Sequence, residues 1–183
     1  ASPIEVDFTQ KHLQLKLDFT DDYGDPRNGL NVRILQDSFP SVNQGAEYDS
    51  VTFALTYYLP IPEDNTWAFH YFRSDSYVKQ EGNTDLESLK TAQGYYACGG
   101  IAACEAATLK SAQNQLYANK NGSSKSLGGA DRLRSYPLSR YQSAHTLFYG
   151  TELRWNFSTE NTKLDYWLLQ DVQQALQAVF FWE

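Results

Sequence analysis

A strict alternation of apolar and polar residues is the strongest pattern along the chain. In HLQLKLDF (12–19), three leucines and Phe19 fall on one face and four polar residues fall on the other. The same alternation recurs in GLNVRILQ (29–36), VTFALTYYL (51–59), TWAFHYF (66–72) and TLFYGTELRWNF (146–157), and LQAVFFWE (176–183) reads as a further strand. Because a period of two puts successive side chains on opposite faces of a strand, the pattern predicts six strands and an all-β fold. We expect these strands to form one contiguous antiparallel sheet in sequence order.

The connections between these strands differ strongly in length. DDYGDPRNG (21–29) and PIPEDN (60–65) are short and rich in turn residues, whereas the segment over about 79–145 is very long. Within it, residues 101–118 are rich in Ala, Leu, Gln and Lys, which predicts a short surface helix. NKNGSSKS (119–126) then predicts a flexible link. Short turns at one end of a sheet and long loops at the other are typical of outer-membrane barrels.

Composition narrows the choice of architecture. The formal net charge of −7 argues against a nucleic-acid partner bound through a basic face. No apolar run approaches the ~20 residues of a membrane-spanning helix, whereas the alternating strands of a barrel are hydrophilic on average. Two architectures remain: a barrel whose apolar face meets lipid, or a soluble secreted β-sandwich such as an adhesin module. Aromatic residues make up 15% of the chain and lie mostly on the apolar face, which favours the barrel.

The start of the chain carries its own expectation. It contains no Met at all and begins without a signal-peptide pattern. We therefore expect it to be a processed product or an excerpt from a longer protein.

Candidate chemistry is sparse. Cys98 and Cys104 could close a small disulfide loop in an oxidising compartment, could remain free thiols, or could bind a metal with two further ligands; we favour the disulfide. The three histidines lie far apart in the sequence, and neither a nucleophile motif nor a phosphate-binding loop accompanies them. The sequence therefore predicts no catalytic residue, no metal and no cofactor, and the protein is not expected to be an enzyme.

A family resemblance emerges from five consecutive segments. GLNVRILQDSF, YDSVTFALTYYLPIPEDNTWAFHYFRSDSYV, LGGADRLRSYPLSRY, LFYGTELRWNF and LQAVFFWE follow one another as in the bacterial surface antigen superfamily. These outer-membrane assembly and translocation barrels include the central subunit of the barrel assembly machinery, two-partner secretion transporters and their organelle relatives. The resemblance extends from about Leu13 to Glu183.

Its most specific element is a glycine pair followed by a tetrad of an aliphatic residue, arginine, glycine and an aromatic residue on a long extracellular loop. In this chain the element is formed by Gly128, Gly129, Leu133, Arg134, Ser135 and Tyr136. Ser135 stands where the family usually has glycine.

The resemblance implies the following architecture and function. Residues 1–183 would form part of an outer-membrane β-barrel domain, about six strands of some sixteen, with the loop over about 79–145 entering the lumen. The protein would insert or translocate polypeptides at the bacterial outer membrane. Its partners would be outer-membrane lipid, polypeptide substrates and periplasmic or lipoprotein accessory subunits. The family's periplasmic repeats would precede Ala1.

The same resemblance assigns a role to Arg134. In the family, the tetrad arginine pairs with acidic residues on the inner wall, which match Glu152 and Glu183 here. The alternation independently places both glutamates on the polar faces of their strands. A guanidinium in a confined lumen needs carboxylate partners, and its planar fork can engage two of them. We expect Arg134 to contact Glu152, Glu183 or both, and Arg132 and Arg140 to be solvated loop charges.

Overall fold

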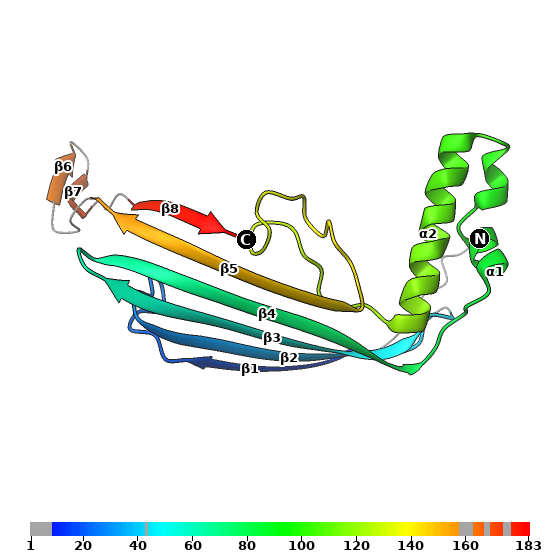
Figure 1. Cartoon of the computed structure of the whole chain (residues 1–183), viewed down its shortest axis with the longest axis horizontal. Coiled ribbons are helices and arrows are strands. Elements are labelled where there is room, and N and C mark those ends of the chain that lie inside the picture. The colour runs from blue at the N-terminus through cyan, green and yellow to red at the C-terminus, as the bar shows by residue number, and fades with distance from the viewer. Residues whose placement is uncertain (1–8, 43, 158–162, 167–168, 174–176) are drawn as a thin grey trace.

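A six-stranded antiparallel sheet dominates the computed structural model, which describes residues 9–42, 44–157, 163–166, 169–173 and 177–183. Its strands run in the order β1-β2-β3-β4-β5-β8 (Figure 1). Their bounds are Lys11–Asp18 (β1), Gly29–Phe39 (β2), Glu47–Ile61 (β3), Asn65–Gln80 (β4), His145–Asn156 (β5) and Gln177–Trp182 (β8). The prediction of an all-β chain with six antiparallel strands in sequence order is confirmed. Within the described residues the sheet is open, with β1 and β8 as its edges.

A separate hairpin was not predicted. Between β5 and β8 the chain forms β6 (Lys163–Tyr166) and β7 (Leu169–Gln173), which pair only with each other. Both strands are short, so an alternating pattern has little length over which to show itself.

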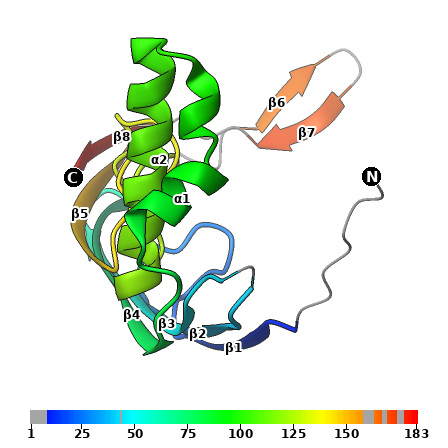
Figure 2. The same cartoon turned by 90° about the vertical axis from the view of Figure 1, so that its right-hand side faces the viewer.

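The register divides the sheet into two faces of opposite character. The apolar face carries the leucines of β1, of which Leu15 and Leu17 pair with Ile34 and Val32, and continues through Phe53 and Leu55. The polar face carries the alternate residues. It includes small hydroxyl side chains such as Thr52 and Ser74, which are almost fully buried. Figure 2, viewed along the strands, shows the sheet as a trough whose hollow side holds the chain between α2 and β5.

Burial is inverted relative to an ordinary soluble domain. Within the strands, most of the large apolar side chains left exposed lie on the apolar face, for example Leu13 at 69% and Trp155 at 49% of their full accessibility. The largest side chains that are fully buried are polar: Thr52, Thr66, Asp37 and Ser74. In a soluble protein the apolar face would be the covered one.

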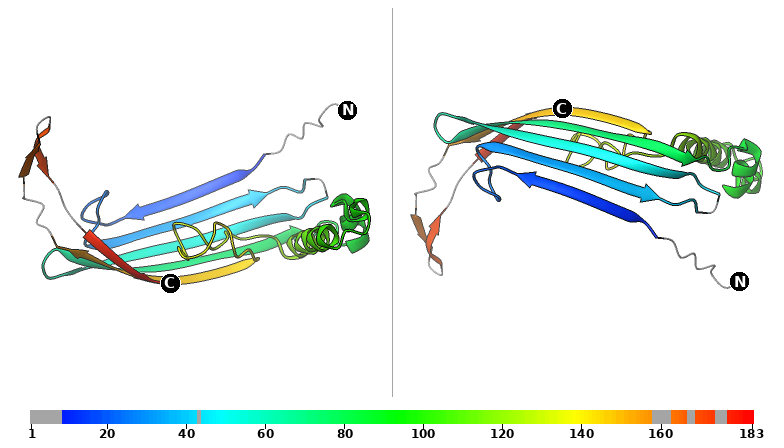
Figure 3. Two further views of the ribbon diagram at one scale, coloured as in Figure 1. Left: turned by 90° about the horizontal axis from the view of Figure 1, so that it is seen from above. Right: turned by 90° about the horizontal axis from the view of Figure 1, so that it is seen from below.

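The long connection between β4 and β5 begins with a helical segment. It contains α1 (Leu86–Ala92), a 3₁₀ turn, η1 (Tyr95–Cys98), and α2 (Ala102–Asn121). The helix predicted at 101–118 is present and continues to Asn121, whereas α1 and η1 were not predicted. Asp85 caps α1 by accepting hydrogen bonds from two backbone amides of its first turn. This segment stands at one end of the sheet, beyond the strand ends, as seen from above and below (Figure 3).

Candidate functional site

Residues 122–144, here called the inner loop, lie on the polar face of the sheet. Its two arms run antiparallel to each other and join through a bridge between Leu127 and Tyr141. The sheet holds the first arm directly: the Lys125 amide donates to Ser74 Oγ at 3.1 Å. Thr146 Oγ1 donates to the Lys125 carbonyl at 2.9 Å. The buried hydroxyls of the polar face thus serve as docking points for loop backbone.

The glycine pair shapes the end of this loop. Gly128 and Gly129 have φ angles of 106° and 110°, in the region that favours glycine. A Cβ at Gly128 would lie 2.3 Å from the carbonyl oxygen of Pro137, a contact that no side chain tolerates. The Gly129 amide donates to the Tyr136 carbonyl at 3.1 Å. The glycine pair therefore closes a tight coil of the chain. Arg134 lies halfway along this coil.

Arg134 contacts both predicted glutamates. Its Nη2 donates to Glu152 Oε2 at 2.7 Å, and its backbone amide donates to Glu183 Oε2 at 2.6 Å. Arg134 Nε lies 3.3 Å from Glu183 Oε1, an ion-pair distance without the alignment of a hydrogen bond. The guanidinium also lies over the Phe181 ring, 4.6 Å from its centroid. Both carboxylates are more than nine-tenths buried, so their charges depend on these partners.

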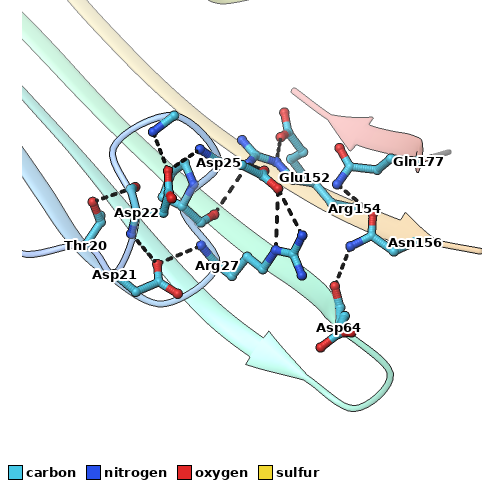
Figure 4. A network of polar contacts seen from close by, with 12 residues as sticks. Thr20, Asp21, Asp22, Asp25, Arg27, Asp64, Glu152, Arg154, Asn156 and Gln177 are labelled. Carbon is cyan, nitrogen blue, oxygen red and sulfur yellow. Dashed lines mark hydrogen bonds and ion pairs between the residues drawn. The ribbon is translucent and has the colours of Figure 1, made fainter. Parts of the chain in front are cut away.

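The charge network continues beyond the predicted residues. Glu152 also accepts a hydrogen bond from Arg154 Nε at 2.6 Å, so one carboxylate lies between two guanidinium groups. Arg154 Nη1 in turn lies 3.4 Å from Asp25 Oδ1, in the turn between β1 and β2 (Figure 4). Arg154 and Asp25 were missed by sequence reasoning. The spacing of Glu152 and Arg154, two residues apart on one strand, was the available signal that they share a face.

The β1–β2 turn is organised by its own aspartates. Asp21 Oδ1 accepts from the backbone amides of Asp22, Arg27 and Asn28, each at 3.0 Å. Bonds from Asn28 and Arg27 hold the pKa of Asp21 below its usual value. This bonding fixes a turn that reaches from the β1–β2 end of the sheet to Arg154 on β5.

The prediction that Arg132 is a solvated loop charge is wrong. Instead of standing in solvent, its guanidinium lies over the ring of Phe72, 4.0 Å from the centroid, and burial lowers the pKa of Arg132. Phe72 is a large aromatic side chain on the mostly polar face, and it offers a cation–π surface that the loop sequence does not reveal. Arg140 is exposed, as predicted.

A second ionic contact holds the first arm of the inner loop. Lys125 Nζ lies 3.0 Å from Asp37 Oδ2, and His12 Nδ1 lies 2.5 Å from Asp37 Oδ1. Asp37 is only 2% exposed. The loop is therefore attached through charges near the β1–β2 edge as well as at β5 and β8. This contact was not predicted.

The remaining predicted residues fall into two groups. Cys98 and Cys104 form the predicted disulfide, which joins η1 to the first turn of α2. Ser135 is exposed, and the positive φ angle within the tetrad falls on Leu133 instead, at 53°. Tyr136 is partly exposed and packs edge-on against Tyr141 at 5.4 Å between ring centroids.

No family model matches the chain, and neither a curated protein nor a solved structure is similar to it at a significant level. Within the described ranges, no group of three or more His, Cys, Asp or Glu side chains is arranged to hold a metal ion. None of the described helices is long and apolar enough to cross a membrane.

Proposed function

We propose that the chain forms part of an outer-membrane β-barrel that inserts or translocates polypeptides, with the inner loop anchored inside it through Arg134. The observation that carries this proposal is the inverted burial of the sheet. An aliphatic or aromatic side chain that stays exposed to water lacks about 1.5–3 kcal/mol of the stabilisation that burial would give it. On every strand of the sheet, large side chains of the apolar face are exposed in this way. Such a face is stable only against an apolar surrounding.

The dimensions of the apolar face fit a bilayer. On β3 the apolar positions span 51–59, about nine residues, which at ~3.3 Å per residue is roughly 30 Å and matches a membrane-crossing strand. Trp67 and Trp155 lie toward the short-turn end of this band. Toward the other end, Asp75 pairs with Arg73 and His145 on the same face. Aromatic residues and charges at the two borders are the arrangement expected at the water interfaces.

The open edges of the sheet complete the argument for a barrel. Lipid offers no hydrogen-bond partners, so an unpaired strand edge cannot stay in the hydrocarbon region. In the proposed protein, β1 and β8 therefore pair with further strands. The trough seen in Figure 2 would then be a segment of the barrel wall, in the family resemblance about six strands of sixteen.

The polypeptide-handling role rests on the inner loop and its anchor. The motif residues Gly128, Gly129 and Arg134 place the loop against Glu152 and Glu183, the pairing that the resemblance implies. A loop held on the polar wall by charges can occupy the lumen without closing it permanently, because a buried ion pair contributes little net stability. We regard the pair as a conformational anchor for the assembly or transport cycle.

Tryptophan fluorescence in lipid vesicles tests the membrane part of the proposal. The full-length protein is reconstituted into vesicles whose acyl chains carry bromine, which quenches only nearby indole rings. We expect strong quenching, reduced when Trp67 or Trp155 is replaced by Phe, and weak quenching by an iodide salt in the water. A protein that stays monomeric in buffer without detergent and is quenched by iodide would instead support the soluble β-sandwich.

A further inference from the structure

A polar cavity of about 360 Å³ lies between α2 and the inner loop, away from the Arg134 anchor. The helix contributes Lys110, Asn114 and Tyr117, whose spacing places them on one face of α2. The loop contributes Arg140 and Gln142. The volume falls at the small end of the range for small-molecule sites.

The charges of this cavity have one sign. Lys110 and Arg140 are its ionisable cations, and its lining includes no Asp or Glu. Among the described residues, neither cation takes part in an ion pair. In a chain of net charge −7, two unpaired cations beside one hollow create a local field that favours an anion.

The rest of the lining includes several side chains that can bind the hydroxyl groups of a ligand. Asn114 and Gln142 carry amides, and Ser139 and Ser143, which carry hydroxyls, also line the cavity. Tyr117 is 46% exposed, and its hydroxyl lies 3.4 Å from Ser143 Oγ. Such a ring can cover one apolar face of a sugar, while amides and hydroxyls meet its edge.

We propose that this cavity binds an anionic saccharide, a sugar ring that carries a carboxylate, sulfate or phosphate group. Arg140 and Lys110 engage the anion through charge-assisted hydrogen bonds, and Tyr117 packs against the ring. The cavity is too polar for an apolar ligand. The proposal depends only on the cavity lining and stands whether or not the sheet belongs to a barrel.

Titration calorimetry of the purified full-length protein tests this site with three probes. These are a galacturonate disaccharide, the corresponding neutral galactose disaccharide, and inorganic phosphate. We expect the acidic disaccharide to bind at least tenfold more tightly than either of the others, with an affinity that falls as salt is added. Equal affinity for the neutral sugar, equal affinity for phosphate alone, or no binding of the acidic disaccharide would overturn the proposal.

Matched variants locate the binding. Lys110→Gln combined with Arg140→Gln should weaken the binding of the acidic disaccharide at least tenfold. Lys120→Gln, on the same helix but outside the cavity, should leave its affinity unchanged. Equal losses in the two proteins would refute the site. Circular dichroism checks that α2 remains folded, and vesicles carrying a uronic-acid glycolipid, compared with the free disaccharide, distinguish a lipid-borne sugar from a free one.

Discussion

The connection between β4 and β5 contains two halves that keep their shape by different means. Residues 81–121 form α1, η1 and α2, whose hydrogen bonds are mostly local and which one disulfide closes. Residues 122–144, the inner loop, contain no helix or long strand and dock instead on Ser74, Asp37, Glu152 and Glu183.

The difference shows which half can respond to events in the sheet. A segment held by local bonds keeps its shape when its surroundings move. A segment held by distant side chains changes when those side chains move or lose a partner. Perturbing each half in turn should therefore affect only that half.

Removing the Arg134 side chain should have the largest effect, and only on the inner loop. Arg134→Ala eliminates the hydrogen bond to Glu152 and the ion-pair contact between the guanidinium and Glu183, a loss of about 2 kcal/mol in docking free energy, while the bond from the backbone amide to Glu183 remains. The sheet should still fold, because Arg154 continues to compensate the charge of Glu152. We expect faster proteolysis and hydrogen exchange across 122–144 and unchanged exchange in α2; the proposed function also predicts impaired assembly or transport by the full-length protein.

Arg140→Ala is the control for the exchange measurement, because the Arg140 side chain is exposed and takes no part in the contacts with Glu152 and Glu183. Arg134→Lys should recover part of the protection, since an ammonium group can reach one carboxylate but cannot fork between two. Unchanged exchange of the inner loop in Arg134→Ala would mean that the anchor does not hold the loop.

Opening the disulfide should loosen the other half. Replacing Cys98 and Cys104 with serine removes a constraint on a short loop, worth about 2 kcal/mol. Hydrogen exchange should accelerate in η1 and the first turn of α2, while the Arg134 region keeps its protection. If the inner loop loosened equally, the two halves would be coupled and the comparison would fail.

Much of the fold could be predicted because it rests on the side-chain period of two. That pattern predicted all six strands of the sheet and their order. It did not predict β6 and β7, which are too short for the alternation to stand out. It also did not predict α1, although Asp85 followed by Glu87 was a readable signal for a helix start.

The predicted part of the site consists of the residues that the alternation and the family resemblance indicated together. Alternation placed Glu152 and Glu183 on the polar face, and the motif supplied Arg134. The partners Asp25 and Lys125 depend on which turn or loop arm lies beside which strand, a matter of register and curvature that one sequence does not encode locally. Arg132 was misjudged for the same reason: its partner, Phe72, is distant in sequence.

A change at the glycine pair should affect the inner loop less than loss of Arg134. Gly128→Ala adds a Cβ within 2.3 Å of a backbone oxygen, at a φ angle of 106°. The coil must open, at a cost of about 1–2 kcal/mol, and Arg134 should then approach Glu152 less often. Hydrogen exchange of the Gly129 and Ser139 amides measures the opening.

Ser135→Gly is the matched comparison for Gly128→Ala. Ser135 is exposed and does not have a positive φ angle, so introducing a glycine at this position should not tighten the anchor. Slower exchange of the Arg134 amide in this variant would show that the serine does restrict the loop.

The smallest expected effect is a pH dependence confined to the helical half. Lys90 Nζ donates to Glu87 at 2.7 Å, and the Tyr96 hydroxyl also donates to Glu87. Lys90 first, and Tyr96 second, hold the pKa of Glu87 below its ordinary value of 4.5. Because the folded-state pKa is lowered, the contribution of Glu87 to stability is fully present above pH 4.5 and is lost as pH falls through the lowered value.

The carboxyl chemical shift of Glu87 measures this titration. It should titrate below 4.5, and Lys90→Gln should move its midpoint upward. The inner-loop amides should not follow this titration; if they did, a local charge in one half would reach the other, and the separation of the two halves would be refuted.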